Sequence, residues 1–278
     1  MLETRDLTVR FGGHVAVDQV SCRFEAGTLT AIVGPNGAGK TTYFNLISGQ
    51  LPASAGSVWL DGQDLTALSA PMRTRRGLGR AFQLTQLFPN LSVQENVRLA
   101  VQARAQGRGE AGLDLLRVWL DRRVWIEESL GLLEQVRLAD KRDATAASLP
   151  HGDQRKLEVA VLMALQPKVY MFDEPTAGMS VDEVPVVLDL IRQLKTRKDC
   201  CILLVEHKMD VVRELSDRIV VLHNGAKVAD GEPAAVIALP IVQQAYLGVV
   251  DAEPDHAAEQ DGFPSRPAPS ERGSSQHV

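Results

Sequence analysis

The chain contains a glycine-rich segment, residues 34–41, whose residue types and spacing suit it to hold phosphate groups. It matches the pattern G-x-x-x-x-G-K-[ST] and lies between the apolar run Leu29–Val33 and an apolar-periodic stretch that includes Phe44. In such a strand–loop–helix order, backbone N–H groups and a helix N-terminus surround phosphate oxygens. We expect Lys40 to reach the β- and γ-phosphates of a nucleotide and the Thr41 hydroxyl to bind Mg²⁺. The residues expected to contact the nucleotide are Gly34, Pro35, Asn36, Gly37, Ala38, Gly39, Lys40, Thr41 and Thr42.

Two adjacent carboxylates, Asp173 and Glu174, follow the apolar run Val169–Phe172. A buried strand that ends there brings Asp173 to the nucleotide crevice, where it can bind Mg²⁺ directly or through water. Glu174 can accept a proton from an attacking water. A solvated Asp–Glu pair at a strand end is the common alternative. The phosphate loop in the same chain favours the catalytic interpretation.

A histidine, His207, follows another apolar run, Cys201–Val205, with Glu206 between them. If this run is a parallel strand beside the one that ends at Asp173, His207 lies at the same edge of the sheet. A neutral imidazole there can donate a hydrogen bond to a γ-phosphate oxygen and orient the attacking water. The alternative is a surface histidine just past a strand.

Continuous apolar runs predict the elements that must position these residues. Such runs are typical of parallel strands that are buried on both faces. They cover residues 29–33, 169–172, 201–205 and 219–222. An apolar helical face, Val184 to Leu194, separates the second run from the third, and this alternation indicates an α/β core. Short strand-like pieces at 7–11, 20–24 and 57–60 come earlier, and the stretch from about 92 to 145 has a helical pattern without strand signals.

Composition excludes several classes of protein. The 278 residues include 30 basic and 35 acidic side chains and three cysteines, so neither a basic nucleic-acid footprint nor a disulfide framework is present. The apolar runs are shorter than the roughly 20 residues of a membrane span, and the N-terminus lacks the pattern of an export signal. We therefore expect a cytosolic protein that is able to dock onto a membrane partner.

The last 28 residues, 251–278, differ from the rest of the chain. They contain four prolines, six acidic residues and two basic ones, which gives this tail a formal charge of −4 out of the total of −5. Low hydrophobicity with proline and net charge predicts disorder. The folded body is therefore predicted to be residues 1–250, with a formal charge near −1.

Taken together, these motifs resemble the ATP-binding subunit of an ABC transporter over about residues 2–248. Two further positions carry the likeness. Phe11, followed by two glycines, is similar to the aromatic residue that stacks on adenine. Gln83, in the letters RAFQ, is similar to the glutamine that touches Mg²⁺ and the attacking water. Residues 149–154 and 177–180 occupy the positions of the family's signature segment and D-loop.

The resemblance implies a P-loop ATPase core with a mostly parallel sheet, an N-terminal antiparallel β subdomain and an inserted helical subdomain at about residues 92–165. It implies that ATP and Mg²⁺ are the ligands, with the metal held by Thr41, Gln83 and Asp173. The catalytic residues would be Glu174, His207, Gln83 and Lys40. In a head-to-tail dimer of two ATP-binding subunits, identical or different, the segment with His151, Gly152 and Asp153 would face the nucleotide of the other subunit.

The implied partners are that second ATP-binding subunit, integral membrane permease subunits and an extracellular or periplasmic solute-binding protein, without nucleic acid. The implied location is the cytoplasmic face of the inner or plasma membrane, as a peripheral subunit. The apolar residues Leu87, Phe88 and Leu91 lie where the family receives a helix of the permease, although core packing is an equal alternative. Arg73, Arg75, Arg76 and Arg80 are interpreted as a solvated basic face.

Two departures from the family pattern concern the contact between subunits. The signature normally supplies a serine to the opposite γ-phosphate, but Pro150 stands in that position and has neither a hydroxyl nor a backbone N–H. The D-loop normally ends in aspartate, and here it ends in Ser180. One of the two composite ATP sites of the dimer is therefore predicted to be weaker.

Finer features favour the branch that imports branched-chain and other hydrophobic amino acids. These are the letters FGG at 11–13, RAFQ at 80–83, the Leu-x-His-Gly signature and the ending AYLG at 245–248. Importers of urea or short amides are very similar and remain an alternative. Two other classes stay open: a soluble ABC ATPase of DNA repair or ribosomes, and an interaction subunit that binds ATP without hydrolysing it.

Overall fold

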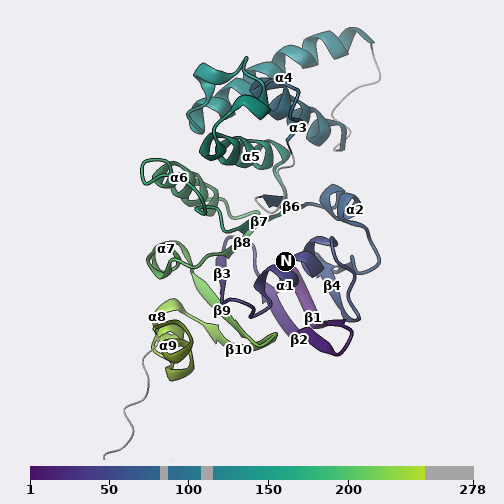
Figure 1. Ribbon diagram of the computed structural model, residues 1–278. Coiled ribbons are helices and arrows are strands. Elements are labelled where there is room, and N and C mark those ends of the chain that lie inside the picture. Colours follow the sequence, from purple (N-terminus) through teal and green to yellow (C-terminus); the bar gives the residue numbers. More distant parts are fainter. Residues whose placement is uncertain (82–86, 108–114, 248–278) are drawn as a thin grey trace, which may run out of the picture.

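A twisted, mostly parallel sheet of six strands forms the centre of the chain. The computed structural model describes residues 1–81, 87–107 and 115–247 (Figure 1). The strand order is β10-β9-β3-β8-β7-β6, and only β10 is antiparallel to its neighbour. The bounds are β3 (Leu29–Val33), β6 (Leu78–Ala81), β7 (Val169–Asp173), β8 (Cys201–Val205), β9 (Arg218–His223) and β10 (Ala226–Gly231). All four strands predicted from apolar runs belong to this sheet.

Parallel register brings the ends of three neighbouring strands to one edge. Val205 of β8 pairs with Asp173 of β7 on one side and with Ile32 of β3 on the other. Every residue of β3, β7 and β8 is buried. The segments that follow these strands, which carry the phosphate loop, Glu174 and His207, therefore start side by side.

A second sheet is antiparallel and contains the N-terminal part of the chain, with the strand order β2-β1-β4-β5. The bounds are β1 (Leu2–Phe11), β2 (His14–Phe24), β4 (Ala55–Leu60) and β5 (Gln63–Asp64). Helix α1 (Lys40–Ser48) shares one hydrophobic core with this sheet and with the inner face of the parallel sheet, through Tyr43, Phe44 and Ile47 among others. The expected α/β fold, with a mostly parallel sheet beside an antiparallel one, is confirmed.

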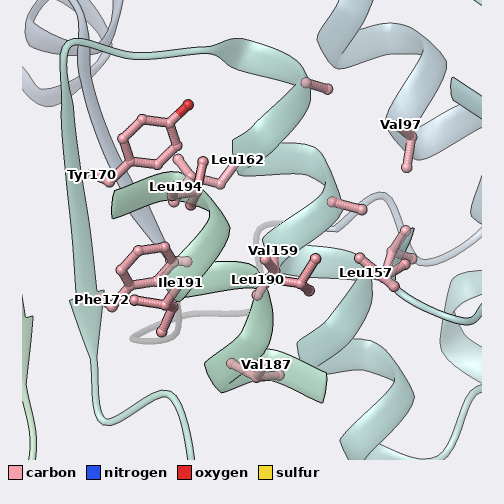
Figure 2. Close-up of a cluster of buried hydrophobic side chains, with 14 of the residues drawn as sticks. Val97, Leu157, Val159, Leu162, Tyr170, Phe172, Val187, Leu190, Ile191 and Leu194 are labelled. Atoms are coloured by element: carbon pink, nitrogen blue, oxygen red, sulfur yellow. The ribbon is translucent and has the colours of Figure 1, made fainter. Parts of the chain in front are cut away.

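The other face of the parallel sheet is covered by helices. Along β7, Tyr170 and Phe172 pack against α5 (His151–Leu165) and α6 (Val184–Lys195), as Figure 2 shows, while Met171 faces the α1 side. This two-sided burial explains why the strand reads as an unbroken apolar run. Helices α3 (Val93–Gly107) and α4 (Leu115–Gln135) pack with α5 and lie together at one end of the molecule in Figure 1.

The remaining elements are short. They are α2 (Ala70–Arg75), α7 (Met209–Leu215), α8 (Pro233–Ile237), α9 (Pro240–Leu247) and the 3₁₀ turns Ala139–Lys141 and Ala146–Ser148. Within the described ranges, every helix is too short or too polar to cross a bilayer. The proposed tail at 251–278 and the expected site residue Gln83 both lie outside the described residues.

Candidate nucleotide-binding site

The glycine-rich loop connects β3 to the start of α1, and two of its glycines are required by close backbone approaches. A Cβ on Gly34 would lie 2.2 Å from the carbonyl oxygen of Leu222, and one on Gly39 would lie 2.5 Å from that of Ala16. Gly39 is also the N-cap of α1 and has φ +96°, a backbone conformation that residues other than glycine rarely adopt. The loop is therefore held tightly around the end of the sheet, as a phosphate-binding loop requires.

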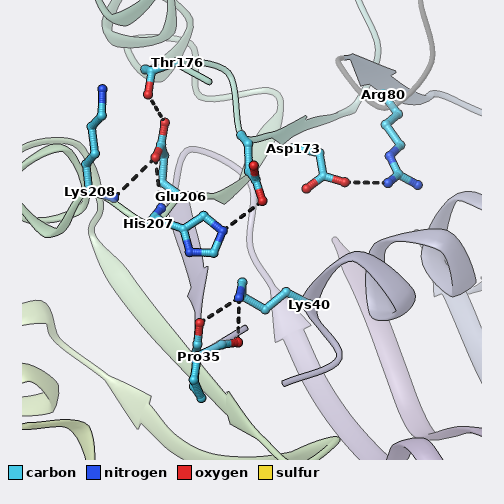
Figure 3. Close-up of polar contacts among 10 residues, drawn as sticks. Pro35, Lys40, Arg80, Asp173, Thr176, Glu206, His207 and Lys208 are labelled. Carbon is cyan, nitrogen blue, oxygen red and sulfur yellow. Dashed lines mark hydrogen bonds and ion pairs between the residues drawn. The ribbon is translucent and has the colours of Figure 1, made fainter. Parts of the chain in front are cut away.

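Lys40 lies inside this loop. Its ammonium donates hydrogen bonds to the carbonyl oxygens of Gly34, at 2.6 Å, and Pro35, at 3.0 Å (Figure 3). The residue is only 6% exposed, and burial lowers its pKa, while the charges of Glu174 and Asp173 work to raise it. These two carboxylates thus act on the ammonium, and all three groups belong to one electrostatic site.

A cavity of about 260 Å³ opens along the loop. It is lined by His14, Ala16, Asn36, Gly37, Ala38, Gly39, Lys40, Thr41, Thr42, Glu174 and His207. Seven of the nine loop residues expected to contact a nucleotide therefore share one cavity with Glu174 and His207. His14 and Ala16 come from β2, and sequence reasoning missed them because nothing in a strand pattern distinguishes them.

Phe11, expected to stack on adenine, is half exposed at the end of β1 and is not among the lining residues, so its role stays a prediction.

Asp173 forms a buried ion pair with Arg80. The guanidinium donates to the carboxylate at 2.7 Å, and both side chains are 6% exposed. Burial raises the pKa of Asp173, and Arg80 works against that rise. Arg80 also donates to Asn45, Ser48 and Gln50, which lie in or just after α1. It therefore ties the carboxylate at the end of β7 to the helix that follows the phosphate loop.

The interpretation of the arginine run as a solvated face is wrong for two of its four members. Arg80 is used as just described, and Arg73 is 3% exposed. Arg73 donates to the carbonyl oxygens of Leu46 and Ile47 at the end of α1, which offers cations unsatisfied acceptors. Arg75 and Arg76 are exposed, as expected.

Glu174 and His207 meet across the edge of the sheet. The Nε2 atom of His207 lies 2.8 Å from a carboxylate oxygen of Glu174, and each side chain is about 40% exposed. The backbone N–H of Glu174 donates to the carbonyl oxygen of Val205, which joins the two loops at their start. Glu174 has φ +52°, a left-handed conformation that is strained for a residue with a side chain.

The signature segment begins α5, with Pro150 as the N-cap. His151 is exposed, whereas Asp153 is only 4% exposed and forms ion pairs with Lys141 and Lys156 at 2.5 and 2.7 Å. Burial works to raise the pKa of Asp153, but its hydrogen bonds and the charges of both lysines outweigh burial and lower it. The carboxylate is thus engaged within its own subunit, and nucleotide contact by this segment stays a prediction.

Gly152 packs directly against the carboxylate of Glu183. A Cβ at this position would meet the carboxylate oxygens of Glu183 at 2.2 Å. Glu183 accepts hydrogen bonds from the backbone N–H and hydroxyl of Ser180, so its carboxylate is fixed from the D-loop side. The start of α5 and the residues before α6 are therefore packed on each other without room for a side chain at 152.

The donor set suits Mg²⁺ when a phosphate supplies further ligands. Magnesium is usually bound through one or two carboxylates, waters and substrate phosphates, not by a cage of protein ligands. Thr41 offers a hydroxyl on the loop, and Asp173 offers a carboxylate at the end of β7, two strands away from β3 in the sheet. Among the described residues there is no cluster of three or more His, Cys, Asp or Glu side chains that would hold a metal alone.

Comparisons with known proteins agree on one family. A family model described as ABC transporter matches residues 17–177. The chain is 36% identical to the high-affinity branched-chain amino acid transport ATP-binding protein BraF of Pseudomonas aeruginosa, covering 89% of this chain and 98% of that protein. It is equally identical, with the same coverage, to the corresponding protein LivG of Escherichia coli. A solved ADP conformation of an ATP-binding cassette of an ABC transporter superposes with a TM-score of 0.72 at 28% identity, covering 89% and 98% of the two chains.

The parallel sheet, the glycine-rich loop and the facing carboxylates define a P-loop nucleotide-binding domain. More narrowly, the chain belongs to the ABC transporter family and carries its ATP-binding domain, an ATPase that drives transport.

Removing Arg80 tests the buried ion pair. Arg80→Met is expected to lower the free energy of unfolding at pH 7 by about 3–5 kcal/mol, because the carboxylate of Asp173 stays buried without its cation. The charge of Arg80 lowers the pKa of Asp173, so in the variant the carboxyl group protonates more readily. The loss of unfolding free energy should therefore be smaller at pH 5 than at pH 7. Urea unfolding at both pH values measures this. The exposed Arg75→Met is the control, and equal losses in the two variants would contradict the assignment.

Asp153→Asn tests the ion pairs at the start of α5. Folding holds the pKa of this carboxyl below its ordinary value of 3.8, so the ionised form is favoured and its stabilisation is complete above that pH. The variant should lose about 1–2 kcal/mol at pH 7. The difference from wild type should shrink as the pH falls through the lowered pKa. Thermal unfolding between pH 7 and pH 3 is the measurement, with the exposed Asp143→Asn as control. A pH-independent difference would oppose this account.

Proposed function

We propose that this chain hydrolyses ATP at the cavity along residues 34–42 and thereby powers a membrane importer of branched-chain or other hydrophobic amino acids. The observation that carries the catalytic part is the contact between Glu174 and His207 at 2.8 Å, beside the buried Lys40. A general base, a polar group that orients it and a phosphate-binding cation then share one cavity.

Each residue of the cavity has a role that follows from its chemistry. Lys40 exchanges its bonds to loop carbonyls for bonds to the β- and γ-phosphates, as a compact ammonium can. Glu174 orients and deprotonates the attacking water. His207 lies next to that carboxylate, and the single N–H of its neutral imidazole donates to the γ-phosphate once ATP is bound. Thr41, Asp173 and Gln83 would hold Mg²⁺, which would supply positive charge to neutralise the charge that develops on the phosphates. Phe11 stacks on the adenine.

The transport part of the proposal rests on the relatives. Both BraF and LivG are described as branched-chain amino acid transport ATP-binding proteins, and this chain matches nearly their whole length. The partners proposed are permease subunits, a second ATP-binding subunit and a solute-binding protein, with this chain peripheral at the cytoplasmic face of the membrane. The exposed Phe88 and Leu91, which precede α3, are the surface proposed for the permease. Import of urea or short amides is the second candidate.

Two substitutions separate binding from hydrolysis. Glu174→Gln keeps the shape of the side chain but removes the base, so ATP binding should persist while kcat falls by about 10²–10⁴-fold. Lys40→Ala should weaken binding as well, because the phosphates lose their buried cation. Affinity for a fluorescent ATP analogue and the rate of phosphate release report the two effects. Wild-type hydrolysis by Glu174→Gln would refute its assignment as the base.

Identifying the solute requires the assembled complex. The full-length chain is co-purified with its permease and solute-binding protein, and candidate solutes are tested for retention by the binding protein and for stimulation of ATP hydrolysis. Leucine or isoleucine should be retained if the amino-acid proposal is right. Retention of urea instead would replace it with the second candidate and leave the ATPase assignment intact.

A further inference from the structure

Glu206 carries a buried carboxylate that has no part in the roles assigned above. The residue is only 3% exposed, although it lies one position before the exposed His207. A buried carboxylate is costly unless several donors satisfy it. It follows the last residue of β8, Val205, so its side chain lies at the edge of the sheet where the catalytic loops begin.

Three donors converge on this carboxylate. The hydroxyl of Thr176 shares a hydrogen bond of 2.5 Å with one oxygen. The backbone N–H groups of His207 and Lys208 both donate to the other oxygen, at 2.9 and 3.4 Å. Figure 3 shows Glu206 between Thr176 on one side and the chain of His207 and Lys208 on the other. Thr176 is itself 3% exposed, so the bond between the two side chains is shielded from water.

These bonds close a ring between two loops. One loop runs from Glu174 to Thr176 after β7, and the other from Glu206 to Lys208 after β8. They are joined at Thr176–Glu206, at His207–Glu174 and by the backbone bond from Glu174 to Val205. Glu206 connects the two loops directly, since it accepts hydrogen bonds from the peptide N–H groups of His207 and Lys208 in one loop and from the hydroxyl of Thr176 in the other.

His207 needs a residue that restrains its position because its own side chain is exposed. Its side chain is 40% exposed, so packing restrains the ring weakly. The bonds to the N–H groups at 207 and 208 restrain its backbone instead, and the bond to Thr176 sets the distance to the loop of Glu174. Small displacements of a catalytic group lower the rate strongly, because the reacting geometry is narrow.

We propose that Glu206 is a positioning residue that holds the His207 ring against Glu174, with Thr176 as its anchor. This inference rests on the proposed ATPase roles of Glu174 and His207. Glu206 does not touch the nucleotide cavity, whose lining contains His207 and Glu174 but neither Glu206 nor Thr176. It therefore acts on the rate of hydrolysis through His207 and leaves nucleotide affinity alone.

The test uses the full-length chain and compares kcat, KM for ATP and affinity for a fluorescent ATP analogue. Glu206→Gln and Thr176→Val should each lower kcat by about tenfold or more, with KM and affinity unchanged. Thr176→Ser keeps the hydroxyl and should restore most of the rate. The matched control is Glu158→Gln, which neutralises another buried carboxylate, on α5 and paired with Arg155, and should leave kcat unchanged.

A double-mutant cycle separates positioning from simple stabilisation. If Glu206 acts through His207, adding Glu206→Gln to His207→Ala should change kcat by less than about twofold. Multiplicative losses in the double variant would overturn the proposal, as would a fall in nucleotide affinity or a rate loss explained wholly by unfolded protein in thermal melts. If His207→Ala itself hydrolyses ATP at the wild-type rate, the proposed ATPase roles fail instead, and this inference falls with them.

Discussion

Parallel pairing of β3, β7 and β8 is the constraint on which the rest of the structure depends. The hydrogen-bonded register places Ile32, Val205 and Asp173 in one row, so that the chain leaves the sheet three times at nearly the same place. This pairing is stable only because both faces of the strands are covered, by α1 and the N-terminal sheet on one side and by α5 and α6 on the other. Groups that are far apart in sequence thereby become neighbours.

The exclusion of water that stabilises the sheet also makes the burial of charged groups at its edge unfavourable. Asp173 and Lys40 are both buried. Burial raises the pKa of Asp173 and lowers the pKa of Lys40, and both shifts favour the neutral form of the group. Partners offset this cost: Arg80 for Asp173, loop carbonyls for Lys40, and three donors for Glu206. The site thus contains charged side chains that are fixed in a region of low dielectric constant. Electrostatic interactions with a phosphate group are stronger in such a region than in water.

The sequence predicted the parallel strands, the tight glycine-rich turn after β3 and the position of His207 at the same sheet edge as Asp173 and Glu174, because each depends on local pattern and on a general rule of parallel sheets. It missed β6, since Gly79 and Arg80 interrupt the apolar pattern. A Cβ at Gly79 would collide with Leu162 and Pro167, and Arg80 is buried only because Asp173 lies on the next strand. Arg73, His14 and Ala16 were missed for the same reason: their surroundings come from elements that are distant in sequence, which spacing alone does not reveal.

The left-handed backbone of Glu174 has a consequence for how this protein can vary. Such a conformation costs about 1–3 kcal/mol for a residue with an ordinary side chain, and glycine or asparagine adopts it with much less strain. The position of the proposed base is therefore one where inactivating substitutions relieve strain. In a laboratory selection for heat resistance alone, glycine and asparagine at 174 would be favoured over glutamate. Glutamate would be retained at 174 only if the selection also acted on turnover.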